Sequence, residues 1–78
     1  MRAAEVLTFV VRQLVDTPDE VSVSIVNGER EIVLELAVNA DDLGKVIGKR
    51  GRTAKALRTL VKSAGALDGE NVTVEILD

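Results

Sequence analysis

The sequence contains no cysteine and no histidine. Without cysteine the chain cannot form disulfides or present a thiolate nucleophile, and without histidine it lacks an imidazole base and the commonest transition-metal ligand. We therefore expect no catalytic residue, no metal site and no cofactor.

Aromatic side chains are almost absent, since Phe9 is the single phenylalanine and there is no tyrosine or tryptophan. Folds that stack nucleic-acid bases on a sheet need Phe or Tyr on its open face. The position of Phe9, in the first predicted helix, disfavours such a fold.

Long apolar runs are also missing. The N-terminal stretch from Met1 to Val15 is interrupted by Glu5 and Arg12, so it predicts neither a signal peptide nor a membrane span. With 78 residues, of which 46% are hydrophobic, residues 1–78 are expected to form a single domain with one core. We expect a cytoplasmic protein that does not associate with membranes.

The charges are unevenly distributed along the chain. The net charge is −3, yet seven of the ten basic residues fall within residues 45–62, where there is no acidic residue. These are Lys45, Lys49, Arg50, Arg52, Lys55, Arg58 and Lys62. A local positive surface attracts phosphates even on an acidic protein. The alternative, a solvated helix face, normally alternates Glu with Lys.

Apolar spacing predicts three helices. Residues 3–15 form an amphipathic helix that stops before Pro18, and a short helix follows Asn39 to Val46 or Ile47, with Asp42 in a capping-box position. The last helix runs from about residue 51 to Ala64. The predicted buried positions are Ala3, Val6, Leu7, Val10 and Leu14, widened by Phe9, Val11 and Val15, and then Ala54, Leu57, Leu60, Val61 and Ala64. Residues 65–69 are expected to form a loop between two glycines.

A period of two predicts strands over residues 21–26, 31–38 and 72–76, with a hairpin turn at Asn27-Gly28. The order α-β-β-α-α-β indicates an α+β domain whose helices lie on one face of a three-stranded mixed sheet. The first two strands should be antiparallel, and the second and third parallel through a right-handed crossover. The open face should be acidic and solvated, and collects Ser22, Ser24, Glu31, Glu35, Thr73 and Glu75.

Two glycines three residues apart stand inside the basic segment, in the sequence Gly48-Lys49-Arg50-Gly51, which we name the GKRG loop. Glycines allow a sharp turn and a close approach of a nucleic-acid backbone to the loop's N–H groups. The helix that follows directs its N-terminal dipole to the same place. A Gly-x-x-Gly alone is weak evidence for a phosphate-binding loop, because many such pairs are ordinary helix–helix turns.

The segment from Gly44 to Arg58, GKVIGKRGRTAKALR, resembles the signature of a KH domain, a module that holds four nucleotides of single-stranded backbone with its Gly-x-x-Gly loop. The element order resembles the type II KH fold. The whole chain is similar to the small bacterial single-KH proteins of the KhpA family, in which the KH domain is essentially the entire protein. The resemblance implies single-stranded RNA as ligand, a role in RNA regulation or as an RNA chaperone, and a homodimer or a heterodimer with a second KH-containing protein. It also links some family members to cell division and cell shape.

The resemblance assigns the GKRG loop to the sugar-phosphate backbone and places Val46, Ile47 and Ala54 at or near the apolar groove for bases. Ile47 and Leu57 are assigned to the core in preference to the groove. The strand end Leu36-Ala37-Val38 resembles the groove's other wall. The predicted RNA-binding residues are Gly48, Lys49, Arg50, Gly51, Arg52, Lys45, Lys55, Val46, Ile47 and Ala54.

Three other functions compete with this interpretation. A phosphate-binding loop of nucleotide hydrolases needs four residues between its glycines and a Ser or Thr after the Lys, whereas three residues separate Gly44 from Gly48 and Arg50 follows Lys49. We therefore do not expect an enzyme. A protein-interaction module could use the first helix or the apolar residues Val26, Val33 and Leu77, and it is compatible with RNA binding. A reader of double-stranded DNA lacks an obvious groove-reading helix.

Overall fold

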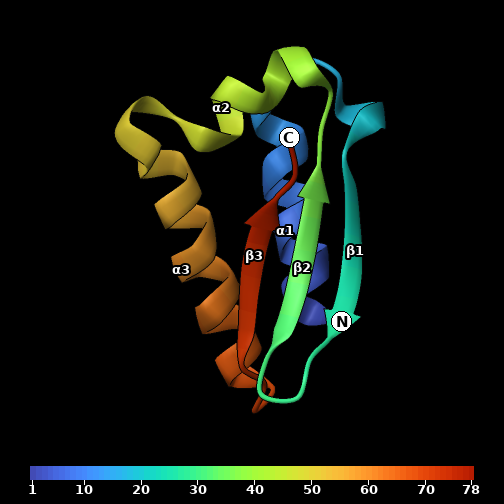
Figure 1. Ribbon diagram of the computed structural model, residues 1–78, viewed down its shortest axis with the longest axis vertical. Coiled ribbons are helices and arrows are strands. Elements are labelled where there is room, and N and C mark those ends of the chain that lie inside the picture. The colour runs from blue at the N-terminus through green and yellow to red at the C-terminus, as the bar shows by residue number, and fades with distance from the viewer.

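The computed structural model describes all of residues 1–78 and consists of one sheet with helices on one side of it (Figure 1). The elements in chain order are α1 (Arg2–Leu14), β1 (Ser22–Asn27), β2 (Ile32–Ala37), α2 (Leu43–Ile47), α3 (Arg52–Leu67) and β3 (Val72–Ile76). Single 3₁₀ turns precede β1, precede α2 and join α2 to α3. The predicted α-β-β-α-α-β order and the α+β class are confirmed.

The sheet has the order β1-β2-β3, with β1 antiparallel to β2 and β2 parallel to β3, as predicted. A turn over residues 28–31 closes the hairpin, and Gly28 N–H donates to the Glu31 carbonyl over 2.9 Å. In the register, Ser24, Glu35 and Glu75 form one row across the open face. No helix covers this face, so the predicted acidic, solvated surface is confirmed.

The core lies between the sheet and the helices α1 and α3. The middle strand contributes Leu34 and Leu36, both fully buried, and α1 contributes Ala3, Leu7 and Val11 at four-residue spacing. Leu57 and Val61 of α3 complete the core from the side of β3. A Leu→Ala change at Leu34 or Leu36 should cost about 2–5 kcal/mol, which is a large part of the stability of so small a domain.

Some predicted core positions are wrong. Phe9 is 67% exposed because it lies two residues from Leu7, on the opposite side of α1. Leu14 is exposed because it is the last residue of α1. Leu60 is exposed because it precedes the buried Val61 in α3 and therefore lies about 100° away from it around the helix. Ile25 belongs to the inward-facing row but sits on the edge strand β1, where the cover is incomplete.

The predicted loop at residues 65–69 is shorter than expected, because α3 continues to Leu67 and includes Gly65. A Cβ at Gly65 would stand 2.6 Å from Val72 Cγ2 and 3.1 Å from the Glu70 carbonyl. This glycine therefore serves a close approach of helix to strand. The helix ends where Gly69 takes a φ of +70° and donates to the Ala66 carbonyl.

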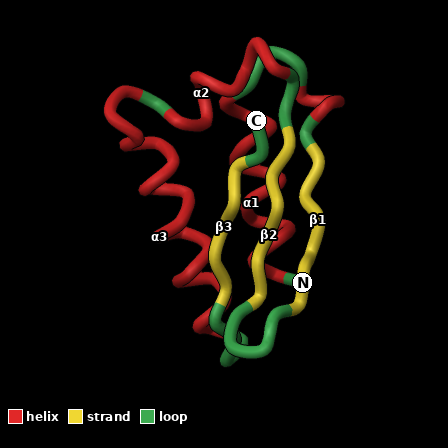
Figure 2. The backbone as a smooth tube through the Cα atoms, viewed as in Figure 1, coloured by secondary structure: helices red, strands yellow, loops and turns green.

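The loop that joins α2 to α3 lies at the opposite end of the molecule from the β1–β2 hairpin (Figure 2). The helices are too short and too polar to cross a lipid bilayer.

Candidate nucleic-acid interface

The GKRG loop reverses the chain with three positive φ angles. Gly48 has φ 76° and ψ 173°, Arg50 has φ 59°, and Gly51 has φ 73°. A Cβ at Gly48 would overlap the Thr53 hydroxyl and stand 2.9 Å from the Thr53 backbone nitrogen. At Gly51 nothing lies within 4 Å, so only the backbone angle favours glycine there. The left-handed Arg50 adds strain of a kind that concentrates at functional loops.

No side chain caps the first turn of α3. The Arg52 N–H donates to the Lys49 carbonyl of the preceding turn, and the next N–H groups of the helix have no side-chain acceptor. A helix of 16 residues also places a partial positive charge at this end. These groups form a ready site for an anion beside the loop.

The basic side chains of the loop and of the first turns of α3 are exposed and unpaired. Lys49, Arg50, Arg52 and Lys55 all face solvent. The ion pairs of the molecule involve the N-terminus, Arg2 and Lys45 instead. Four of the predicted site residues thus present their charges freely at one end of the molecule.

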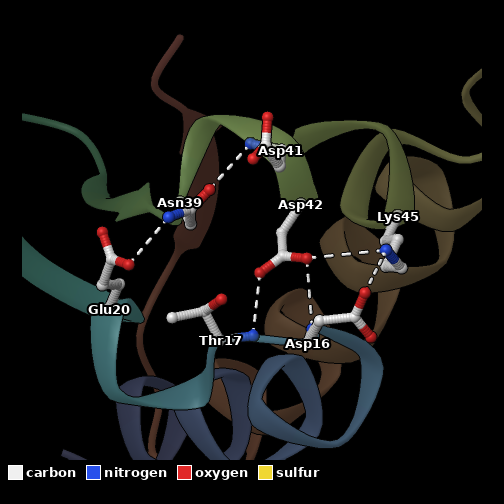
Figure 3. Close-up of polar contacts among 7 residues, drawn as sticks. All are labelled: Asp16, Thr17, Glu20, Asn39, Asp41, Asp42 and Lys45. Atoms are coloured by element: carbon white, nitrogen blue, oxygen red, sulfur yellow. Dashed lines mark hydrogen bonds and ion pairs between the residues drawn. The ribbon is translucent and has the colours of Figure 1, made fainter.

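Lys45 is also a predicted site residue, but its charge is engaged. Its Nζ lies 2.9 Å from Asp16 Oδ2 and 3.6 Å from Asp42 Oδ1 (Figure 3). The hydrogen bond to Asp16 and the attraction of that carboxylate raise the pKa of Lys45 above its ordinary value. The ammonium is therefore directed at two carboxylates of the protein.

Asn39 caps the turn before α2, but the capping box predicted between Asn39 and Asp42 is wrong. Asn39 Oδ1 accepts from Asp41 N–H over 2.9 Å, and Asn39 Nδ2 donates to Glu20 over 2.7 Å. Asp42 turns away from Asn39 and accepts from the backbone N–H groups of Asp16 and Thr17 (Figure 3). A pattern within one segment could not reveal these partners, because they lie about 25 residues earlier in the chain.

The three apolar residues of the predicted site divide into buried and exposed ones. Val46 has no exposed surface and Ala54 is 5% exposed, so both support the loop from the core. Ile47 is 39% exposed, so its assignment to the core is wrong, and it stands directly before Gly48 where a base could reach it. Leu57, at 3% exposed, is core as predicted.

The strand beside α3 is β3, because β2 is the middle strand and Leu36 is fully buried. Leu36 therefore cannot line a groove, but Ala37 and Val38 border a hollow of about 180 Å³ together with Leu43 and Leu77, so the groove wall stays a prediction. A second hollow, of about 280 Å³, lies beside α3 and is lined by Arg58 and Lys62, by the acidic Glu31, and by Asn71 and Thr73. The parallel pairing of β3 with β2 places β3 beside α3, and this pairing could have identified Asn71 and Thr73 as residues that line the hollow.

Residues 4–76 match the family described as KhpA/KhpB, KH domain. The chain belongs to the KhpA/KhpB family of KH domains. The predicted resemblance and the type II KH fold are confirmed, and this is not an enzyme family.

Curated relatives extend over nearly the whole KH domain. The RNA-binding protein KhpA of Clostridium acetobutylicum is 52% identical over 73 residues, which cover 94% of this chain and 97% of the relative. The protein of the same name from Leifsonia xyli is 52% identical over 75 residues, with 96% of both chains covered. The relative from Borreliella burgdorferi is 46% identical over 74 residues and covers 95% of this chain and 90% of its own.

Among solved structures, Era from Aquifex aeolicus, bound to GDP and aluminium fluoride, contains a similar fold. It superposes with a TM-score of 0.66 at 22% identity, over 95% of this chain and 29% of Era. At this identity the likeness concerns the fold alone, and the KH domain corresponds to less than a third of that chain.

Proposed function

We propose that this KH domain binds single-stranded RNA and holds about four nucleotides with the GKRG loop and the groove beside it. One observation carries the proposal. A strained glycine loop with free cations stands at the N-terminus of a 16-residue helix that no side chain caps. The relatives named RNA-binding protein KhpA support the choice of RNA over other polyanions.

The loop would act on the sugar-phosphate backbone. Its glycines let phosphates approach the main chain, and the side chains of Lys49, Arg50 and Arg52 add full charges around the same point. Phosphate contacts of this kind fix the position of the strand but do not read its sequence. Selectivity would then come from the groove.

The groove for the bases would lie on the β3 side of α3. Ile47 offers an exposed apolar surface at its upper end, and the hollow near Arg58 and Lys62 offers polar groups further along. The acidic row of Glu35 and Glu75 on the open face would repel the strand and confine it to this side.

In the cell, we propose a cytoplasmic RNA chaperone or post-transcriptional regulator that acts as a homodimer or together with a second KH protein. The family description, which joins KhpA with KhpB, suggests KhpB as that second protein. Two loops held side by side would raise the affinity for RNA without new base contacts.

A protein-interaction module with incidental affinity for RNA is the second candidate. Leu60 is 38% exposed on the outer side of α3, along a hollow of about 530 Å³ that Ala56 and Ser63 also line. Val26 and Val33, which pair across the open sheet face, offer a further apolar patch.

The test is a charge reversal at the loop tip, Lys49→Asp with Arg50→Asp. Loss of two charged contacts should weaken binding of a single-stranded oligonucleotide by about 30- to 100-fold. The matched control, Arg12→Asp with Arg30→Asp, makes the same change in net charge at exposed sites outside the basic segment. Equal affinity of both double variants would refute the loop assignment.

Salt dependence separates the two candidate functions. If about four phosphates are contacted, the logarithm of the affinity should fall with the logarithm of the salt concentration with a slope of roughly −3. A slope near zero would favour the protein-interaction module.

A further inference from the structure

Asp42 is the one buried charged residue of the molecule, with 2% of its surface exposed. A buried carboxylate is costly unless every lone pair finds a partner. Its position, one residue before α2, and its partners give it a role that neither the fold nor the proposed RNA contacts explain.

Both carboxylate oxygens are satisfied by a distant segment. Oδ1 accepts from the Asp16 backbone N–H over 3.1 Å and Oδ2 from the Thr17 N–H over 3.0 Å (Figure 3). Lys45 closes the network, because its Nζ reaches Asp42 Oδ1 as well as Asp16 Oδ2. We call this group, made of Asp16, Thr17, Asp42 and Lys45, the Asp42 anchor.

The anchor determines where the GKRG loop begins. Helix α2 has only five residues and cannot hold its position by its own backbone hydrogen bonds. Val46 ties it to the core, and the anchor ties its beginning to the end of α1. Gly48, the first residue of the loop, directly follows the last residue of α2, so the orientation of α2 sets the direction in which the loop begins.

We propose that Asp42 is a positioning residue for RNA binding. It holds α2, and through α2 the GKRG loop, in the geometry that meets the phosphates. The proposal rests on the proposed RNA-binding function. It also reassigns Lys45 from a phosphate contact to a part of the anchor.

The sign of the effect separates positioning from simple electrostatics. Asp42→Asn removes a negative charge near the loop, so Coulomb forces alone would strengthen RNA binding. In the anchor, an Asn can accept at one position only, while its NH₂ group faces an N–H donor or the Lys45 ammonium. The proposal therefore expects weaker binding.

The neighbouring Asp41 gives a matched control. It is exposed, and its side chain makes no hydrogen bond or ion pair. Asp41→Asn changes the net charge identically, one residue away, and leaves the anchor intact.

The experiment measures RNA affinity and loop amide exchange for both variants. Asp42→Asn should bind at least about fivefold more weakly than Asp41→Asn, the lower limit of typical coupling between linked sites. The amides of Gly48 and Gly51 should exchange faster in Asp42→Asn alone. Equal affinity of the two variants would overturn the proposal.

Leu7→Val controls for general loss of stability, because Leu7 is fully buried in α1 and takes no part in the anchor. Its RNA affinity should equal that of the unaltered chain at a temperature where all variants are folded. If Leu7→Val binds as weakly as Asp42→Asn, the effect is general and the positioning role is refuted.

Lys45→Met is the second variant, and it keeps both backbone bonds of Asp42. If Lys45 is part of the anchor, Lys45→Met should lower the affinity for RNA without changing the slope of that affinity against the salt concentration. A slope that becomes less steep by about 0.7 would mean a lost phosphate contact and would overturn the reassignment. If the unaltered chain itself fails to bind RNA, the proposed function is refuted. If it binds RNA, but Asp42→Asn and Asp41→Asn bind with equal affinity, only the positioning role is refuted.

Discussion

The substitution Gly48→Ala should be the most damaging single-methyl change in the chain. Gly48 has φ 76° and ψ 173°, a region that is almost restricted to glycine. The new Cβ would overlap the Thr53 hydroxyl and stand 2.7 Å from Thr53 Cβ and 2.9 Å from the Thr53 nitrogen. Rotation of the Thr53 side chain can relieve the first of these contacts but not the last, which is with the main chain.

The expected cost is about 2–6 kcal/mol, from backbone strain and from overpacking together. A domain of this size has a free energy of unfolding near the lower end of about 5–15 kcal/mol. With a urea dependence of about 1 kcal/mol/M for a small protein, the unfolding midpoint should fall by about 2 M or more. RNA affinity should fall as well, because the loop can relieve the strain only by leaving its present shape.

Two other glycines of the same segment calibrate this result. The Cβ of Gly51→Ala would meet no atom within 4 Å, so the substitution should cost only the strain of an alanine in the left-handed region, about 1–2 kcal/mol. Gly44→Ala lies inside α2, also in open space, and should stabilise by about 0.5–1 kcal/mol. The urea midpoints should therefore decrease in the order Gly44→Ala, unaltered chain, Gly51→Ala, Gly48→Ala. A Gly48→Ala midpoint equal to or above that of Gly51→Ala would refute the reasoning.

Two further predictions concern stability. Gly65→Ala should lower the urea midpoint although alanine favours helix, because its Cβ would stand 2.6 Å from Val72 Cγ2. Adding Val72→Ala should recover part of this loss. If the effects of the two substitutions on stability are simply additive, the contact is contradicted. Burial opposes the ionisation of Asp42, but the N–H groups of Asp16 and Thr17 and the charge of Lys45 outweigh it, so the pKa of Asp42 lies below its ordinary value of 3.8. The stability that Asp42 contributes is thus present above about pH 4 and lost as the pH falls through the lowered pKa. The difference in urea midpoint between the unaltered chain and Asp42→Asn should be constant from pH 7 to about pH 5 and shrink below pH 4; a constant difference down to pH 2 would contradict this.

The sequence predicts those features of the fold that arise from local periodicity. Alternation identified the three strands, and a connection long enough to cross over identified the parallel pair. The predictions failed in two ways. At Phe9 and Leu60 the predicted buried stripe of each helix was too wide, and elsewhere a contact between distant segments overrides the local pattern. Gly65 looked like a loop residue until its approach to Val72 was known. Asp42 looked like the capping-box partner of Asn39 because its actual N–H partners lie about 25 residues away in the chain.

The candidate site divides in the same way. The glycines and free cations of the GKRG loop are neighbours in the chain, so sequence alone could group them as a candidate site, and their contact with RNA stays a prediction. Lys45 shares the charge of its neighbours but not their surroundings, since it is paired with Asp16, which follows the end of α1 and lies far from Lys45 in the sequence. The groove wall stays a prediction, because the strand order places β3, and not β2, beside α3, while Ala37 and Val38 line a hollow near α2.

The seven charges of the basic segment therefore do not form one patch. Lys45 is paired with two carboxylates at the surface. Lys49, Arg50, Arg52 and Lys55 surround the start of α3, and Arg58 and Lys62 line the hollow beside β3. In the proposed complex the strand would enter at the loop and follow α3 toward that hollow, while the acidic open face turns it away from the sheet. On this path the loop would supply affinity and the hollow selectivity, while the Asp42 anchor would hold the stem of the loop in place.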